Sequence, residues 1–208
     1  MDMNRSILFV ILCGFLGLSA MTTLSGQADH HGDYLILNVG DTLYGKVEHI
    51  NRRGASANFY KKIRVTNAKG KRKKFKRGDV ESFRVDGVRY EGFWLSQSSD
   101  RIVLINPKYD IDRENGERYF LRIISLGRLS HYQLEWWEQG EASINWMDLL
   151  IKWEDAYFIR STQGIFGLKK KTLSKYFDDC PELVRQIESK ELKKVPEVVN
   201  FYNSYCEN

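Results

Sequence analysis

The sequence predicts a mainly β fold, an antiparallel sheet arranged as a small barrel or sandwich, with a C-terminal tail of two to three helices. Three observations predict this class. Apolar and polar residues alternate from Asp33 onward, the dipeptide Asp86-Gly87 marks a tight hairpin, and helical spacing begins only after Gly167. Strands followed by helices, with short links between them, favour antiparallel structure over alternating parallel units.

The composition is that of a globular protein. The chain has 208 residues, of which 42% are apolar and 28% charged, and its formal net charge is +5. These values exclude a disordered chain and a multispan membrane protein. Three Cys are too few for a disulfide-dense scaffold. A chain of this size can bury a sufficient core by itself, so we expect no cofactor and no structural metal.

The first 28 residues are predicted to be a signal peptide. Residues 7–18 form an apolar run that is shorter than the ~20 residues a membrane-spanning helix needs. Small side chains at Gly26 and Ala28 favour cleavage after Ala28, and cleavage before Gln27 is the alternative. An uncleaved membrane anchor is the other interpretation. We therefore expect an exported protein, in the periplasm or at the cell surface, with no transmembrane span after cleavage.

An antiparallel β domain is predicted over residues 29–166. Gly40-Asp41 should form a turn between two short strands, the second of which places Leu43, Gly45, Val47 and His49 on one side. The following hairpins are expected at two turns, Asn67–Gly70 between strands 59–66 and 71–77, and Asp86-Gly87 within the segment 82–90.

The second half of this domain continues the strand pattern. Four segments have strand length and are rich in aromatic and β-branched residues. Turn points are expected at Asn115-Gly116 and at Gly127. The four expected strands are residues 101–105, 118–126, 129–137 and 156–162.

A helical segment, residues 167–208, is expected to pack on the β domain. Helical spacing occurs over 173–177, and two further helices, 181–190 and 196–205, each begin with Pro-Glu. If these two helices pack antiparallel, Cys180 and Cys206 become neighbours and an oxidising compartment permits a disulfide. Two unpaired thiols are the alternative.

Four segments carry a resemblance to known sequences. They are GDTLYGKVEHIN at 40–51, KGKRKKFKRGDVESFRVDGVRY at 69–90, KKKTLSKYFDDCPELVRQI at 169–187 and VVNFYNSY at 198–205. Together they resemble a group of small exported proteins of unknown function from Bacteroidetes-type Gram-negative bacteria. The resemblance implies a signal peptide, a strand-rich body and a helical C-terminus. No activity is defined for that group, so the resemblance implies no catalytic residue.

The run KGKRKKFKR is the main candidate for a binding site. Residues 29–95 carry a net charge of +7, whereas residues 96–208 carry −2. A basic hairpin could bind polyanions through long-range attraction and charge-assisted hydrogen bonds. Protection of an exposed edge strand from aggregation is the more common reason for such lysines, and an acidic protein partner is a third interpretation. The cationic residues are Lys69, Lys71, Arg72, Lys73, Lys74, Lys76 and Arg77.

Two weaker candidates were weighed against simpler explanations. Cleavage after Ala28 would leave Asp29, His30 and His31 at the N-terminus, a nitrogen set that suits Cu(II) or Ni(II), although two histidines near a terminus are usually a coincidence. A second candidate is an aromatic surface for carbohydrate stacking, although core and interface positions are commoner for tryptophan. It would consist of Trp136, Trp137 and Trp146, of which the first two should face opposite sides of a strand.

Catalytic motifs of the familiar hydrolase, metalloprotease and phosphate-binding kinds do not occur in the sequence. Paired acids could flank a glycosidic bond, either Asp110 with Asp112 or Glu135 with Glu138. His49 and His131 are isolated within strand patterns and are expected to be half-buried structural residues.

The sequence thus favours a non-enzymatic exported protein that binds anionic glycans, lipid headgroups or an envelope protein, without specific nucleic-acid recognition. The alternatives are a small envelope hydrolase that uses paired carboxylates and a purely structural envelope component.

Overall fold

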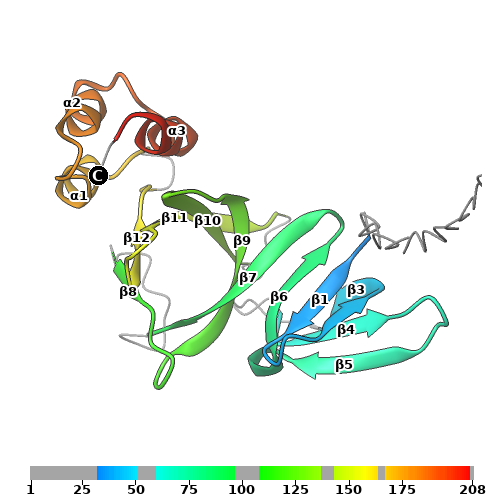
Figure 1. Ribbon diagram of the computed structural model, residues 1–208. Coiled ribbons are helices and arrows are strands. Elements are labelled where there is room, and N and C mark those ends of the chain that lie inside the picture. The colour runs from blue at the N-terminus through cyan, green and yellow to red at the C-terminus, as the bar shows by residue number, and fades with distance from the viewer. Residues whose placement is uncertain (1–31, 51–59, 97–107, 137–142, 164–166, 207–208) are drawn as a thin grey trace, which may run out of the picture. The chain divides into compact units, whose positions relative to one another are not determined.

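The computed structural model describes residues 32–50, 60–96, 108–136, 143–163 and 167–206, all of which belong to one unit that begins at His31 (Figure 1). Within these ranges the chain forms twelve strands, a short 3-10 turn and three C-terminal helices. The strands pair antiparallel in two sheets, and neither sheet closes into a barrel within the described ranges. The predicted mainly β class with a helical C-terminus is therefore confirmed.

The larger sheet has nine strands in the order β2-β1-β6-β7-β9-β10-β11-β12-β8. Most neighbours in this order are also neighbours along the chain, as in a meander of hairpins. The strands are β1 (Tyr34–Leu37), β2 (Thr42–Tyr44), β6 (Val80–Val85), β7 (Val88–Leu95), β8 (Lys108–Asp110), β9 (Glu117–Ser125), β10 (Leu129–Trp136), β11 (Asn145–Lys152) and β12 (Tyr157–Arg160).

The smaller sheet has three strands in the order β3-β4-β5. They are β3 (Lys46–His49), β4 (Lys62–Thr66) and β5 (Arg72–Lys76), and the 3-10 turn η1 (Arg77–Asp79) follows at once. The hairpin between β4 and β5 uses the predicted turn, in which Gly70 has a φ of 75°. Backbone amides of Lys69 and Lys71 donate to Oδ1 of Asn67, each at 3.0 Å, which stabilises this turn.

Gly45 divides what the sequence predicted as one strand. It has a φ of 143°, and a Cβ atom here would lie 2.3 Å from the carbonyl oxygen of Thr66. Only glycine fits such a close approach of two backbones at this angle. The chain consequently leaves the larger sheet at Tyr44 and enters the smaller sheet at Lys46. The alternation had suggested that Leu43 and Val47 share one strand face. They lie instead in two different strands, on either side of Gly45.

The hairpin between β6 and β7 turns at Asp86-Gly87, as predicted. Asp86 has a φ of 49° and Gly87 a φ of 80°, the left-handed pair that a tight two-residue turn requires. Oδ1 of Asp33 accepts the backbone N–H of Asp86 at 2.9 Å. This bond connects the turn to the start of β1.

Three buried clusters hold these elements together. The larger sheet curls from β7 to β8 around a core that includes Leu121, Leu134, Leu149 and Phe158. An isolated bridge between Leu95 and Ile111 brings the region after β8 next to the end of β7. A second cluster lies between the smaller sheet and strands β1, β6, β7 and β9, and a third lies between the helices and strands β10 to β12.

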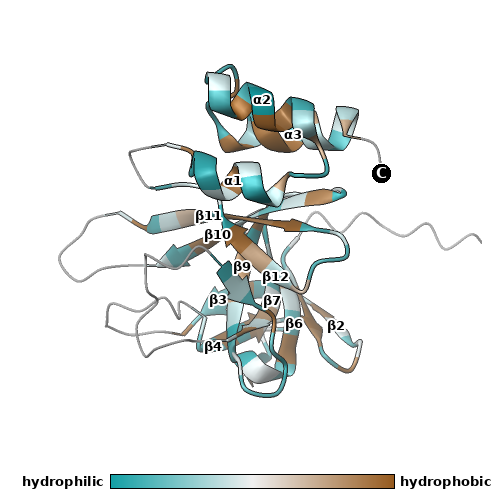
Figure 2. Cartoon of the chain, turned by 90° about the vertical axis from the view of Figure 1, so that its left-hand side faces the viewer, coloured by the Kyte–Doolittle hydropathy of each residue, from teal (hydrophilic) through white to brown (hydrophobic). Residues whose placement is uncertain are grey.

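The helices pack on the larger sheet. They are α1 (Lys170–Tyr176), α2 (Pro181–Ser189) and α3 (Val195–Tyr205), and the hydropathy of their residues is coloured in Figure 2. Leu173, Leu183, Ile187 and Val198 are fully buried with Leu129 and Leu150 of the sheet in the third cluster. Asn203 of α3 also bonds both the N–H and the C=O of Leu129, at 2.8 and 2.9 Å. No helix of the described chain is long and apolar enough to cross a membrane.

The sequence did not predict two of the strands. They are β8, which includes Asp110, and β11 at Asn145–Lys152. The predicted strand 101–105 lies outside the described residues, as do residues 59 and 137 at the ends of two others.

Candidate functional site

The basic run that the sequence singled out lies on and around one edge strand. Among the described strands, β5 pairs only with β4, and four of its five residues are exposed cations. Lys69 and Lys71 lie in the turn before β5, and Arg77 lies in η1 after it. The run therefore passes through three different local structures.

The register of the smaller sheet sorts these side chains into two faces. Lys62 pairs with Lys76, Arg64 with Lys74 and Thr66 with Arg72 across β4 and β5. Lys46 and Glu48 of β3 extend the same face next to Thr66 and Arg64. Side chains at alternate positions share a face, so this side of the sheet carries six cations and one acid. We call it the outward basic face; its cations are Lys46, Lys62, Arg64, Arg72, Lys74 and Lys76.

The opposite face of the smaller sheet is apolar. Val47, Ile63, Val65 and Phe75 are buried in the second cluster, where Phe83 and Phe120 of the larger sheet cover them. Burying side chains of this size contributes about 1.5–3 kcal/mol each. This packing holds the outward basic face toward solvent. Lys73 is the exception on β5, since it lies on the apolar side with its Nζ 5.1 Å from the ring centre of Phe75.

Only two of the six cations form an ion pair within the sheet, and they share the single carboxylate of Glu48. Glu48 accepts a hydrogen bond from Nε of Arg64 at 3.0 Å, and Nζ of Lys46 lies 3.3 Å from the same carboxylate. The hydrogen bond from Arg64, helped by Lys46, holds the pKa of Glu48 below its usual value. The other four cations form no ion pair with any acid in the described chain; they are Lys62, Arg72, Lys74 and Lys76.

Arg77, the last member of the predicted run, does not belong to this face. Its guanidinium pairs with the carboxylate of Glu117 on β9. The neighbouring Asp79 accepts the backbone N–H of Lys76 at 3.3 Å. Arg77 thus ties the end of β5 to the larger sheet, away from the cations of the outward basic face.

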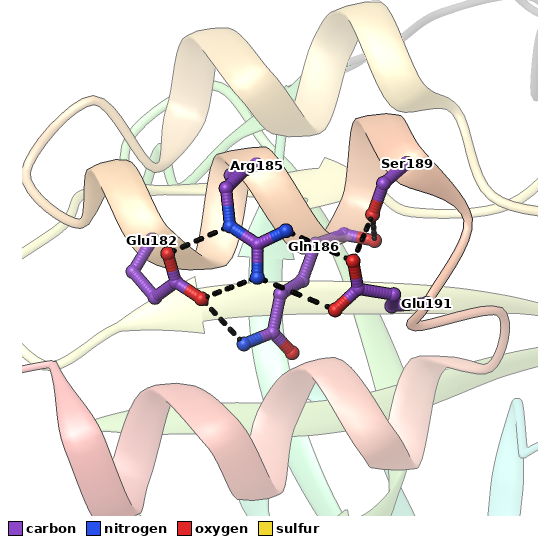
Figure 3. Close-up of polar contacts among 5 residues, drawn as sticks. All are labelled: Glu182, Arg185, Gln186, Ser189 and Glu191. Carbon is purple, nitrogen blue, oxygen red and sulfur yellow. Dashed lines mark hydrogen bonds and ion pairs between the residues drawn. The ribbon is translucent and has the colours of Figure 1, made fainter.

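The helical segment arranges its charges in the opposite way. Figure 3 shows Arg185 of α2 between the carboxylates of Glu182 and Glu191, with bonds of 2.7 to 3.3 Å. The hydrogen bonds from Arg185 and Gln186 lower the pKa of Glu182 to about 2. Charges on the exposed side of this helix are therefore compensated locally, whereas those of the outward basic face are not.

Sequence reasoning missed half of the outward basic face. Lys46, Lys62 and Arg64 stand outside the run of nine residues. They lie at alternate positions of their strands, so the sequence of each strand could have predicted which of its faces is cationic. The strand order β3-β4-β5 brings these sides together, and that order depends on pairings between segments distant in the sequence.

The tryptophan surface is not assembled in the described chain. Trp146 is 58% exposed and lies opposite Glu135, whereas Trp136 lies opposite Asn145 at the next position of the ladder. The two rings therefore project from opposite faces of the sheet. Trp136 packs against the curled core. Trp137 lies outside the described residues, as do Asp29, His30 and His31 of the N-terminal metal candidate.

Cys180 and Cys206 form a disulfide at one end of the helical segment, with their Cα atoms 5.6 Å apart. Both residues are buried in the third cluster, at the start of α2 and the end of α3. This is the neighbourhood of the two cysteines that was expected if the two Pro-Glu helices pack antiparallel.

The candidate catalytic carboxylates take part in local structural contacts. Asp110 pairs with Lys108 at 2.8 Å, and Asp112 accepts the backbone N–H groups of Glu114 and Asn115 in a turn. Glu135 accepts from the hydroxyl of Tyr90 at 2.9 Å and pairs with Arg122 at 3.2 Å. Its expected partner, Glu138, lies outside the described residues.

His131 is more buried than expected. Only 2% of its surface is exposed, and its Nε2 lies 2.8 Å from Oδ1 of Asp148 on β11. Gln133 donates to the same oxygen at 3.0 Å. The histidine therefore belongs to a buried polar network, not to the half-buried surface of a strand. His49, by contrast, is an exposed residue that contacts the ring of Tyr60.

The outward basic face can attract and hold an array of anionic groups. Its cations are about 6.6 Å apart along each strand and about 4.8 Å apart across strands, and they point into solvent. No protein family, curated protein or solved structure matches this chain, so what the site can do is inferred from its own geometry and charge.

Proposed function

We propose that this chain is an exported protein of the cell envelope that binds anionic glycans or lipid headgroups through its outward basic face. One observation carries the proposal: six cations share an exposed sheet face with a single acid. Such a face attracts anions over long range and can make charge-assisted hydrogen bonds to phosphate, sulfate or carboxylate groups.

The position of the cations argues against edge protection as their whole purpose. Lysines that prevent aggregation are needed on edge strands, where backbone groups lack a partner. β5 is such a strand, but β4 is the central strand of its sheet and contributes Lys62 and Arg64 to the same face. Cations on a central strand do not shield an edge. Their gathering on one face instead favours binding.

Like charges face each other directly across this sheet. Lys62 pairs with Lys76, and Arg64 with Lys74. Such pairs destabilise a sheet when they are directly opposite. An arrangement that costs stability is understandable if an external anion relieves the repulsion, which is what a polyanion ligand would do.

Export is proposed on two grounds. The apolar run at residues 7–18 has signal-peptide length and not the length of a bilayer span. The Cys180–Cys206 disulfide is of a kind that persists in oxidising compartments and is rare in the cytosol. Both support a site of action in the periplasm or at the cell surface, where anionic headgroups and glycans are abundant.

The test compares a face variant with a charge-matched control. The face variant carries Arg72→Gln, Lys74→Gln and Lys76→Gln. The control carries Lys171→Gln, Lys175→Gln and Lys193→Gln, which remove three exposed cations of the helical segment. Binding to vesicles of phosphatidylglycerol and phosphatidylcholine, and to immobilised heparin, is measured at increasing salt. We expect the face variant to lose roughly 100-fold in vesicle affinity, since each basic residue near an anionic surface contributes about 1 kcal/mol.

The control variant should bind as the wild type does, and binding of the wild type should weaken steeply with salt. Preference for vesicles over heparin would assign lipid headgroups, and the reverse preference would assign anionic glycans. Binding that is insensitive to salt, or equal loss in both variants, would contradict the proposal.

A further inference from the structure

A small pocket lies just beyond the end of the basic strand, at the 3-10 turn η1. It has a volume of about 280 Å³. Its walls come from η1, from Trp94 of β7, from the turn before β9 and from the first residues of β9. None of the six cations of the outward basic face lines it. Whatever binds here is therefore independent of the function proposed above.

Arg118 in the wall of this pocket carries a buried charge that forms no ion pair within the described chain. Only 7% of its surface is exposed, and no described carboxylate lies within ion-pair distance. One terminal nitrogen donates to the carbonyl of Val80 at 2.8 Å, and to Oδ1 of Asn38 and the carbonyl of Glu81 at 3.4 Å each, but Nε has no acceptor in the described residues. Burial and the nearby charge of Arg113 lower the pKa of Arg118, and the more distant charges of Glu81 and Glu91 offset this only in part. A buried cation without a direct ion pair is costly, and an anion beside it would be favoured.

Gly92 makes room for this guanidinium. A Cβ atom at this position of β7 would lie 2.5 Å from Nε of Arg118. Arg118 therefore lies flat across the backbone of the neighbouring strand, with its central carbon 5.3 Å from the ring centre of Trp94. A residue of any other type at position 92 would push the guanidinium away.

The remaining wall provides an aromatic surface and polar groups. Trp94 is half-buried, so part of its indole ring is accessible. Glu117 is already engaged by Arg77 and by the hydroxyl of Tyr119 at 3.2 Å. That pair is neutral overall, and the charge of Arg118 decides the sign of the pocket. Asn115 adds an amide at the rim.

We propose that this pocket binds a sugar ring that carries a carboxylate. Its volume is close to the lower end of the range for ligand pockets, roughly 300–1,000 Å³. Such a volume suits a single sugar ring better than a longer chain. The indole of Trp94 offers an apolar face for the ring, Arg118 supplies the positive charge for the carboxylate, and the amide of Asn115 and the carboxylate of Glu117 can bond hydroxyl groups.

The ligand test uses the full chain and three soluble probes. D-glucuronate carries both the ring and the carboxylate, D-glucose carries the ring alone, and acetate carries the carboxylate alone. The indole N–H signal of Trp94 is followed by NMR during titration of each probe, after assignment by its loss in Trp94→Phe. We expect a saturable shift with glucuronate at millimolar concentration and at least tenfold weaker responses to the other two.

A pocket-filling variant tests the location without disturbing buried Arg118. Gly78 has an open position whose Cβ would lie 3.8 Å from the ring of Trp94, so Gly78→Leu should fill the pocket without a backbone clash. Gly32→Leu adds the same side chain where no atom lies within 4 Å and serves as the matched control. Glucuronate binding should weaken at least tenfold in Gly78→Leu and remain unchanged in Gly32→Leu.

Three results would overturn this inference: no saturable shift with glucuronate up to about 50 mM, equal binding of glucose or acetate, or undiminished binding by a folded Gly78→Leu variant. The face variant with Arg72→Gln, Lys74→Gln and Lys76→Gln should retain glucuronate binding. Failure of the pocket and failure of the outward basic face are thus measured separately.

Discussion

Asp148 shows how one half-buried residue can connect several strands. Its carboxylate, on β11, accepts bonds from His131 and Gln133 of β10, and its backbone carbonyl accepts the hydroxyl of Ser161 just after β12 at 3.1 Å. Burial raises the pKa of Asp148, but the hydrogen bonds from His131 and Gln133 outweigh it and hold the pKa below the usual value.

This lowered pKa predicts a stability term that disappears in acid. Because the folded protein holds Asp148 ionised more firmly than the unfolded chain does, the term is fully present above the unfolded pKa, about 3.9, and is lost as pH falls through the lower folded pKa. The difference in urea midpoint between wild type and Asp148→Asn should therefore be largest near pH 6 and shrink below about pH 4.

The matched control for this titration is Glu154→Gln, which changes an exposed carboxylate outside the network. It should show no comparable dependence on pH. A difference between wild type and Asp148→Asn that stays constant from pH 7 to pH 3 would contradict the role assigned to the carboxylate.

The same residue explains why His131 was misjudged from the sequence. His131 follows the strand pattern of β10 and has no acid at a neighbouring strand position. Its partner lies on β11, a strand that the sequence did not predict. A buried acid is tolerable only when a partner is present, and that partner becomes visible only after the two strands are paired.

The helical segment is the element whose stability depends most on a covalent bond. The disulfide joins Cys180 and Cys206 across a separation of 26 residues, which spans α2 and α3. Constraining a loop of this length in the unfolded chain stabilises the fold by about 3 kcal/mol. The double variant Cys180→Ser, Cys206→Ser should lose stability of that order in urea denaturation.

Reduction of the wild type should produce a similar loss, and hydrogen exchange should speed up most in the helices. The third cluster would loosen first because both cysteines belong to it. If reduction lowered the free energy of unfolding by less than about 1 kcal/mol, the disulfide would not be the main constraint on this segment.

Elements differ in how well local pattern predicted them. The hairpin at Asp86-Gly87 and the helices that open with proline were predicted, because a turn or a cap is specified by two or three adjacent residues. The division between β2 and β3 at Gly45 was not predicted, because it is caused by the close carbonyl of Thr66, about twenty residues further along the chain.

Charge is distributed unevenly over the molecule. The net charge of +5 comes from the first half of the chain, and the structure concentrates it on one face of the smaller sheet. The helical segment pairs several of its own charges, as at Arg185. The protein is therefore electrostatically polarised.

This polarisation predicts that salt stabilises the protein. Screening weakens the repulsion between cations that face each other on β4 and β5. Thermal unfolding should shift upward by about 2 °C or more between low ionic strength and about 0.5 M NaCl. The face variant should melt higher than wild type at low salt and respond less to added salt; a midpoint that falls with salt would contradict this view.

The sequence by itself determined most of the strands, the three C-terminal helices and the hairpin turns at Asn67–Gly70 and Asp86-Gly87, because those choices depend on residues two to four positions apart. It also identified the basic run of β5. Only the tertiary structure decided that cations from three strands share one face, that His131 meets Asp148, and that Arg118 and Trp94 border a pocket. These contacts join residues distant in the sequence, and their geometry follows from the order in which the strands pair.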